Sequence, residues 1–571
     1  NINLQKIEGS GTLVFENTGT ISELILNDTT MLPTSGEKYF NGDVKFVNMN
    51  LKVENDVSMT AIGMDENSTL NVVGGANLSI TQSANTEFAG TVTVEDSGSI
   101  NVSSKKDANG NFYKLAFTGT EVKGDINVNN GAVQIKQSED LGGKTLTATG
   151  AADLYFSIDE SSVVANKLTS AKVNVAGASS VRLIKTGTGT TKLDGRGNPF
   201  ENIEFVSSNG RARMASPTPP MPVTLGVDNG HLELSYVDQM QGISLATYGA
   251  GTLALEGAQT LDRSITGDGK VKKTGVGTLT VTSNQAFTGK FELAAGKTVF
   301  ENNVSLETSQ LIVNGNATAT GSLTLTNTAS ESVLNLKENG KLILKDGTSV
   351  SYAGTLKVAD IAGTIELAGT PSNSEIVVLK ALGEHADLSL SDQRALLDHI
   401  ELDMVGANKF MLAQNAGTIS VFTMGDSLTS GVSVHEGLGG FVSILDNLMP
   451  QGDKVLEAEM NPLLAKLLRA GSAGIATEIE KLSPLSYSAM VAMSWQAHNN
   501  DIGQFRNRAT ARRFELVNEF ASRDLQFWAT AQGTFAQNGN GNDAAVYDFN
   551  TFGAVIGADT KIDDYTLLGF A

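Results

Sequence analysis

The sequence contains no cysteine, and this absence removes two classes of structure. Without thiols the 571-residue chain can form neither a disulfide framework nor a cysteine metal site. The absence also suits a chain that crosses a membrane unfolded, because no disulfide loop can form early and block a narrow pore. The chain has no uninterrupted apolar run of about 18 residues either, so the sequence predicts no transmembrane helix.

Charged and aromatic residues are sparse as well, at 18% and 6% of the chain, whereas glycine is abundant with 60 residues. Such a composition is typical of a turn-rich chain rather than of a set of ordinary globular domains. The hydrophobic fraction of 40% still suffices for a long core, which argues against disorder. The net charge of −21 offers no basic face for phosphates, so nucleic acid is not an expected partner.

Short alternating segments dominate the sequence up to about residue 425. Residues 11–15, 69–73, 90–94 and 322–326 alternate apolar and polar side chains and are separated by Gly, Asn, Asp and Ser. This pattern predicts strands with one buried face, joined by tight turns. Four of the ten prolines lie in residues 211–222, and such a segment is expected to loop out of the strand ladder.

Internal repeats favour stacked coils over an array of sandwich domains. The pentapeptide Gly-x-Gly-Thr-Leu occurs at residues 9–13, 249–253 and 275–279, and Lys-Thr-Gly-x-Gly-Thr occurs at 185–190 and 273–278. The offset of 26 residues between the last two pentapeptides suggests coils of about that length. We therefore predict a mostly β protein in which residues 1–425 form a long right-handed parallel β-helix, a solenoid.

The periodicity becomes helical in residues 426–524. Ile475, Ile479 and Leu482 share one helical face. The pair Ser483-Pro484 is typical of a helix start, so a helix is expected from Pro484 to about residue 522. This helix carries a basic stretch in an otherwise acidic chain: Arg506, Arg508, Arg512 and Arg513.

From residue 525 the sequence predicts strands of about ten residues. Residues 527–535 and 551–559 alternate apolar side chains with small or polar ones, and a third strand begins at Tyr565. Such strands are typical of an outer-membrane β-barrel, and a hairpin of a soluble protein is the alternative. Because the sequence starts with Asn1 and stops at Ala571 within an apolar stretch, we expect it to be part of a longer protein.

Three regions resemble, in order, the parts of a bacterial autotransporter. Residues 267–281, 284–289 and 295–297 resemble the passenger-associated repeat, and residues 482–487 with the helix after them resemble the helical connector. Residues 527–533, 547–549 and 553–559 resemble the opening strands of the translocator barrel. The resemblance implies a β-helix passenger at 1–425, an α-helical connector at 426–524 and the truncated start of a β-barrel at 525–571.

The resemblance also implies a mechanism, type V secretion. The barrel inserts in the outer membrane with its barrel-assembly machinery, the connector helix occupies the barrel lumen, and the passenger folds at the cell surface. Arg506, Arg508, Arg512 and Arg513 would then face the lumen. Asn499 and Asn500 lie where some autotransporters cleave themselves, although a polar helix face is the favoured explanation for them.

Few residues suggest catalysis. Residues 425–428 (Gly-Asp-Ser-Leu) match an esterase motif with Ser427 as nucleophile, but neither His435 nor His498 has an Asp three positions before it. Residues 95–99 resemble a serine-protease nucleophile segment, yet the first histidine is His231, so a strand–turn–strand is expected there.

The function expected from these observations is that of a non-catalytic adhesive or structural stalk. The five histidines are scattered without metal-ligand spacing, so neither a metal nor a cofactor is expected. The expected partner is a host surface or a glycan. A carbohydrate-active or esterase-type hydrolase is the alternative.

Overall fold

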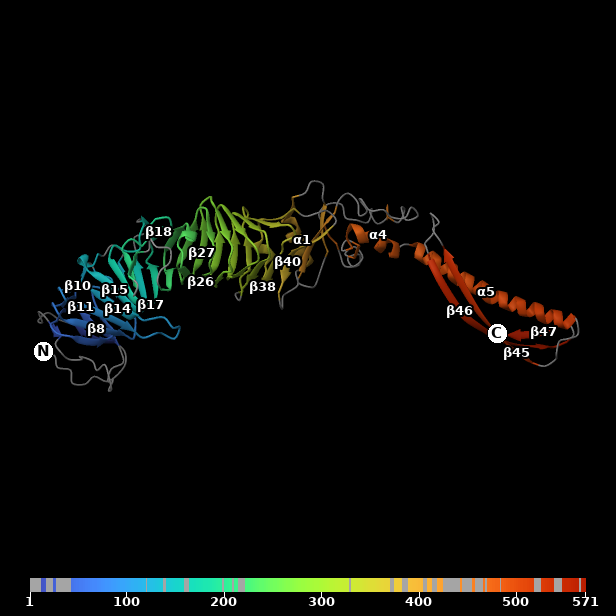
Figure 1. The fold of residues 1–571 in the computed structure, drawn as a ribbon, viewed down its shortest axis with the longest axis horizontal. Coiled ribbons are helices and arrows are strands. Elements are labelled where there is room, and N and C mark those ends of the chain that lie inside the picture. Colours follow the sequence, from blue (N-terminus) through green and yellow to red (C-terminus); the bar gives the residue numbers. More distant parts are fainter. Residues whose placement is uncertain are drawn as a thin grey trace. The chain divides into compact units, whose positions relative to one another are not determined.

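A computed structural model of the protein (Figure 1) describes residues 12–16, 24–26, 43–119, 121–136, 140–158, 164–197, 200–207, 210–213, 221–327, 330–369, 374–382, 389–403, 408–412, 418–424, 442–443, 454–456, 466–467, 470–482, 484–517, 525–538, 547–563 and 566–570. The chain divides into two compact units. Unit 1 comprises Asn1–Thr370, Val377–Asp403 and Gln414–Ile419, and unit 2 comprises Pro371–Ile376, Met404–Ala413 and Ser420–Ala571. The described residues are mostly strands, as the sequence predicts.

Unit 1 consists mainly of parallel sheets. One long sheet contains β1 (Thr12–Glu16), β3 (Asp43–Val47), β5 (Val57–Thr60), β6 (Ile62–Met64), β8 (Asn77–Gln82), β9 (Thr86–Phe88), β11 (Ser99–Ser104), β12 (Lys114–Phe117), β14 (Ile126–Lys136), β15 (Thr145–Ser157), β17 (Lys172–Thr186), β19 (Ile203–Ser207), β20 (Gly210–Arg213), β21 (Val223–Val227), β23 (Ile243–Thr247), β26 (Ile265–Gly267) and β29 (Ala286–Phe287). A second contains β2 (Leu24–Leu26), β4 (Asn50–Val53), β7 (Thr69–Val72), β10 (Thr91–Val94) and β13 (Val122–Lys123).

Strands of three further sheets also pair in parallel. The first is β16 (Val164–Ala165), β18 (Thr190–Asp194), β22 (His231–Ser235), β24 (Thr252–Glu256), β27 (Lys270–Thr274), β30 (Lys290–Leu293), β33 (Gln310–Val313) and β36 (Leu334–Leu336). The second is β25 (Gln259–Leu261), β28 (Thr278–Val281), β31 (Lys297–Phe300), β34 (Asn316–Ala319), β37 (Lys341–Lys345), β39 (Thr364–Ala368) and β41 (Ile400–Leu402). The third includes β32 (Val304–Glu307), β35 (Leu323–Thr326), β38 (Val350–Ala353) and β40 (Ser374–Ala381).

Short helices interrupt these strands. The α-helix α1 (Leu390–Asp398) begins at Ser389, whose hydroxyl accepts the Asp392 N–H at 3.1 Å. The 3₁₀ turns are η1 (Leu141–Gly143), η2 (Val237–Gln239) and η3 (Val358–Asp360). The predicted strand–turn–strand at residues 95–99 is confirmed, because β10 ends at Val94 and β11 begins at Ser99.

The core of unit 1 is built from columns of apolar side chains on equivalent strand positions. Parallel pairing places Leu253 beside Val271, Val271 beside Phe291, Phe291 beside Leu311, and Leu311 beside Leu334. All of these side chains are buried. Each strand therefore buries one face and continues the column of its neighbours, an arrangement consistent with a β-helix-like fold.

The repeat length predicted from the sequence is wrong for these strands. Val271 and Phe291, which are partners on adjacent strands, are 20 residues apart rather than 26. The two pentapeptides at 249–253 and 275–279 end in β24 and β28, which belong to different sheets. Gly-x-Gly-Thr-Leu therefore marks a turn that leads into a strand, and the offset between its copies is not the spacing of paired strands.

Side chains in the turns bind the backbone of neighbouring coils. The Asn284 amide oxygen accepts the Ser305 N–H at 2.8 Å, and Asn303 accepts the Ser322 N–H at 3.0 Å. Buried Gln285 binds the backbone of a strand that comes earlier in the chain: its Oε1 accepts the Ile265 N–H at 2.9 Å. These contacts satisfy backbone groups that the strand ladders leave free at the turns.

Glycine is required where the coils approach most closely. A Cβ on Gly289 would lie 1.5 Å from the Gly269 carbonyl oxygen, and a Cβ on Gly269 would lie 2.8 Å from the Gly251 carbonyl oxygen. Both contacts are with backbone, so no side-chain movement can relieve them. The chain therefore turns at this corner through glycine in successive coils.

The two Lys-Thr-Gly-x-Gly-Thr repeats have a shared structural role. Lys185 and Lys273 are fully buried, and each ammonium group binds carbonyl oxygens of the glycine turn that follows it. Lys185 Nζ donates to Gly187 O at 2.5 Å and to Asn229 O at 2.8 Å. Lys273 Nζ donates to Gly275 O at 3.0 Å and to Thr274 O. The motif thus supplies a lysine that satisfies the carbonyl groups of its own turn.

Unit 2 contains helices and strands with both antiparallel and parallel pairings. Its elements are β42 (Asn408–Leu412), β43 (Thr418–Met424), β44 (Lys454–Leu456), α4 (Gly471–Leu482), α5 (Pro484–Val517), β45 (Gln526–Asn538), β46 (Tyr547–Lys561) and β47 (Leu567–Phe570). Ile475 and Ile479 of α4 are buried on one helical face. The predicted long helix is confirmed from Pro484 to Val517, and Figure 1 shows α5 beside the three-stranded sheet β45–β47.

Among the described helices, none combines the length and apolar character needed to span a bilayer. Of the proline-rich loop predicted at residues 211–222, residues 211–213 lie instead in the strand β20, which pairs antiparallel with β19. Residues 214–220 lie outside the described part of the chain.

Replacing Lys273 with Met should destabilise unit 1. The Thr274 and Gly275 carbonyl groups would lose their buried donor, at a cost of about 1–3 kcal/mol in the free energy of unfolding. Denaturant titration measures this cost. Lys272→Met on the same strand is the control, because the Lys272 side chain is half-buried and its Nζ lies 3.5 Å from a Glu292 oxygen. Equal effects of the two variants would contradict the assigned role.

The stability difference between wild type and Lys273→Met should also depend on pH. Burial lowers the pKa of Lys273 below its ordinary value of 10.5, and the carboxylate of Glu256 opposes this shift only in part. Between the two pKa values the unfolded chain binds more protons than the folded chain, so wild-type stability rises with pH there. The variant lacks this contribution, and unfolding measured at increasing alkaline pH should show a widening difference.

Candidate functional site

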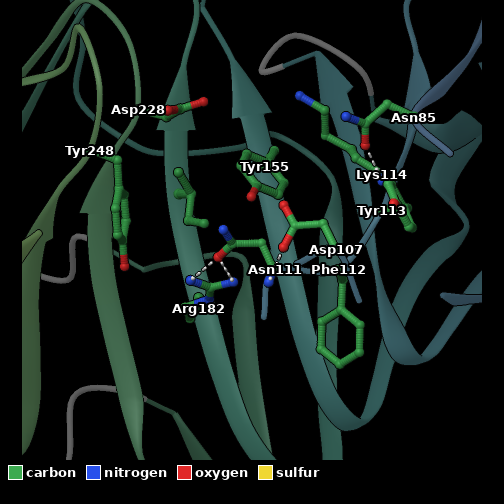
Figure 2. A pocket seen from close by; sticks show the side chains of 11 residues that line it. Asn85, Asp107, Asn111, Phe112, Tyr113, Lys114, Tyr155, Arg182, Asp228 and Tyr248 are labelled. Atoms are coloured by element: carbon green, nitrogen blue, oxygen red, sulfur yellow. Dashed lines mark hydrogen bonds between the residues drawn. The ribbon is translucent and has the colours of Figure 1, made fainter. Parts of the chain in front are cut away.

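The main candidate site is a cavity of about 230 Å³ on the parallel strands of unit 1 (Figure 2). Lys114 comes from β12, Tyr155 from β15 and Arg182 from β17. Asp228 follows β21, and Tyr248 follows β23. The cavity is lined by Asn85, Asp107, Asn111, Phe112, Tyr113, Lys114, Tyr155, Arg182, Ile184, Asp228 and Tyr248.

Strand alternation explains why these side chains face outward. In β15 the buried Leu154 and Phe156 flank Tyr155, so Tyr155 lies on the opposite face of the strand. Parallel register then places Tyr155 beside Ile184 on β17, and Ile184 beside Gly226 on β21. Gly226 has no side chain, and Tyr248 packs into the space above it, 3.0 Å from where a Cβ would be.

A buried ion pair forms the base of the site. Arg182 binds Asp153 with both ends of its guanidinium group: Nε lies 2.7 Å from Oδ1, and Nη2 donates to Oδ2. The Asp153 side chain is 4% exposed and that of Arg182 is 27% exposed. Hydrogen bonding to Asp153 raises the pKa of Arg182, which is therefore a permanent cation. Asn111 Oδ1 accepts from Arg182 at 3.4 Å.

Lys114 lies on the other side of the cavity. Its Nζ donates to Gln134 Oε1 at 2.6 Å and lies 4.7 Å from the centroid of the Tyr155 ring. Burial lowers the pKa of Lys114, and the negative charge of Asp228 partly offsets this effect. Burial also raises the pKa of Tyr155, so this side chain is a neutral phenol at physiological pH.

A small hairpin between β11 and β12 forms the rim. Lys106 and Phe112 pair antiparallel, and Asp107 Oδ1 accepts the N–H groups of Asn109 and Asn111 at 2.9 and 2.8 Å. Asp107 therefore holds the turn, and the turn places Asn111 next to Arg182. The rim is a local structure with its own hydrogen bonds.

This arrangement is suited to binding. It presents aromatic faces, two cations and two carboxylates around a small volume, but no nucleophile with an adjacent base. Among the residues that the structure describes, no three His, Asp or Glu side chains are placed to hold a metal ion.

A second charged cluster lies in unit 2, between α5 and the sheet. Arg508 Nε lies 2.9 Å from Asp559 Oδ2, and Arg512 Nε lies 2.7 Å from Asp559 Oδ1. Arg508 also donates to Gln526 Oε1 at 3.2 Å. Arg512 is 1% exposed and Asp559 is 6% exposed, whereas the Arg508 side chain is 25% exposed, so the shared carboxylate is buried with one guanidinium group buried and the other partly exposed.

The structure separates the four arginines that the sequence grouped. Arg508 and Arg512, four residues apart on one helical face, converge on Asp559, whereas Arg506 and Arg513 are exposed. Asn499 is exposed on α5, and Asn500 lies in the same helix with its side chain outside the described set. Ser427, the esterase candidate, lies outside the described residues.

The opposite face of this sheet is apolar and exposed. Antiparallel register pairs Ala529 with Ile556 and Gly533 with Phe552, on the side away from Asp559. The large exposed side chains here are Phe527, Phe552, Ile556, Leu568 and Phe570. The predicted alternation of apolar and polar residues in 527–533 and 552–559 thus separates the two faces of the sheet.

The cavity in unit 1 was not predicted from the sequence. Its residues come from positions 85 to 248 and share no spacing or motif. Three of the nine tyrosines line this single site, but they lie far apart in the sequence and so offered no local signal. No family model matches the chain, and neither does any curated protein or solved structure.

Removing the buried carboxylate at the base of the cavity should be costly. Asp153→Asn leaves Arg182 without a counter-charge and should lower the free energy of unfolding by about 2–4 kcal/mol, reduced from the fully buried case because Arg182 is 27% exposed. Asp194→Asn is the matched control, since the side chains of Asp194 and Arg196 are 44% and 59% exposed. Urea unfolding of both variants tests this, and a similar loss in both would contradict it.

Proposed function

We propose that the chain is a surface-exported protein of the autotransporter type. In this proposal the strands of unit 1 form a right-handed parallel β-helix that is displayed outside a Gram-negative bacterium. The helix α5 acts as the connector, and β45–β47 are the opening strands of a translocator barrel in the outer membrane. The barrel-assembly machinery would be the partner in insertion.

The observation that carries this proposal is the two-faced sheet in unit 2. One face presents Asp559 to Arg508 and Arg512 of a polar helix, and the other exposes large apolar side chains to its surroundings. A soluble sheet would expose its polar face and cover its apolar face. The reverse arrangement suits strands with lipid outside and a polar lumen that holds a helix.

The repeated strands of unit 1 support the passenger role. Columns such as Val271, Phe291 and Leu311 bury apolar area each time a coil is added to the stack. Folding outside the membrane would therefore release free energy coil by coil, without ATP. The function proposed for the displayed passenger is adhesive or structural, with a ligand on a host surface.

Export should depend on the buried ion pairs of the connector. In Gram-negative cells that express the complete reading frame, Asp559→Asn should reduce surface-exposed passenger by roughly tenfold or more, because two guanidinium groups lose their shared carboxylate. Protease accessibility on intact cells measures the exposed fraction.

Arg513→Gln is the control, since Arg513 is exposed on the same helix and should be exported normally. The proposal would be contradicted if wild-type protein is found only inside the cell. It would also be contradicted if the outer-membrane fraction contains no segment with residues 525–571.

A non-catalytic passenger also gives a clear expectation for enzyme assays. Purified protein should show no turnover of ester or glycoside substrates above the buffer rate. Turnover that Ser427→Ala abolishes would instead establish the esterase alternative, and turnover that carboxylate variants abolish would establish a carbohydrate-active enzyme.

A further inference from the structure

We propose that the cavity of unit 1 binds a neutral pyranose ring of a glycan. This inference deepens the adhesive role proposed above, because it names the ligand class and the site. The aromatic content of the cavity, its hydrogen-bonding groups, its charge balance and its size all favour this ligand class.

Aromatic side chains are concentrated at this site beyond what the composition predicts. Tyrosine makes up nine of 571 residues, yet Tyr113, Tyr155 and Tyr248 all line one cavity of about 230 Å³. An aromatic ring offers a flat apolar face of fixed orientation and loses little conformational entropy when it binds. The C–H groups on one face of a pyranose ring match such a surface.

Polar groups surround the aromatic rings of the cavity, where they can bind the hydroxyl groups of a pyranose. Figure 2 shows Tyr155 between Asp228 on one side and Lys114 on the other, with Asn111 below. Within the described part of the chain, no hydrogen bond ends on the Asp228 carboxylate, so it is free to accept from ligand hydroxyl groups. Lys114 uses one N–H on Gln134 and retains further donors. Acceptor and donor thus flank one aromatic residue.

The charge balance selects a neutral ligand over an acidic one. Arg182 is already paired with Asp153, and Lys114 lies within the field of Asp228. The cavity therefore has no unbalanced positive charge, and an anionic sugar or a phosphate would meet the Asp228 carboxylate. Neutral hydroxyl groups can bind both charged side chains without this repulsion.

The site is also small and rigid. Its volume accommodates a single sugar ring rather than a long chain, which suits the end of a glycan. Lys114, Tyr155 and Arg182 all lie on paired strands, so little ordering is needed when the ligand binds. A rim hairpin stabilised by Asp107 completes the opening.

The test is direct binding by the purified 571-residue chain. A glycan array that carries neutral, sialylated and sulfated glycans shows the preferred class, and titration with methyl glucoside, galactoside and mannoside then measures the affinity. We expect binding of neutral glycans, with a dissociation constant of roughly 1 mM for the best simple pyranoside. Stronger binding of acidic glycans that falls steeply with salt would overturn the proposal.

Two variants and two matched controls locate the site. Tyr248→Ala and Asp228→Asn should each weaken binding by roughly tenfold or more. Tyr236→Ala and Asp262→Asn change the same residue types outside the cavity and should bind as wild type. Circular dichroism confirms folding, and the near-isosteric Asp228→Asn preserves the test if Tyr248→Ala fails to fold.

Neutral-glycan binding that no cavity variant weakens would overturn the assigned site, and folded protein that binds no glycan would overturn the ligand class. Because binding is measured in solution, it does not depend on export. A normal affinity with no surface display would contradict the export proposal alone, and normal display without binding would contradict this inference alone.

Discussion

Parallel pairing of short strands along each sheet is the constraint on which unit 1 depends. A lone strand of four or five residues cannot satisfy its own backbone groups, so every strand needs its neighbours. Once the register is fixed, apolar positions such as Val271 and Phe291 align into columns, and the other face of each strand is free for polar side chains. The turns are then stabilised by asparagine amides, by glycine at the corners and by the buried ammonium groups of Lys185 and Lys273.

The same constraint builds the cavity. Because the register brings Tyr155, Ile184 and Gly226 into one row, residues far apart in sequence become neighbours on the outer face. The missing side chain of Gly226 makes room for Tyr248, and the Arg182–Asp153 pair provides a fixed base. The cavity is thus a gap in the regular outer surface of the strands, and the hairpin between β11 and β12 completes its rim.

Local features of the fold were predictable from the sequence, and long-range ones were not. The turn at residues 95–99, the helix from Pro484 and the two-faced strand at residues 552–559 all follow from patterns within a few residues. The spacing of paired strands did not, because the same turn motif precedes strands of two different sheets. Helical geometry could have separated Arg508 and Arg512 from Arg506 and Arg513. The partner Asp559 could not be found in this way, since it lies on a strand about 50 residues further along the chain.

The turn at residues 275–277 is exposed at its tip and anchored at its base. Val276 lies between Gly275 and Gly277 and is 96% exposed, while Lys273 just before it is fully buried. Lys273 thus anchors the turn, and Val276 forms its exposed tip. Such a tip can change in sequence or accept an inserted peptide without disturbing the stacked strands. An antibody raised against this tip would therefore lose its epitope through substitutions that leave the paired strands intact.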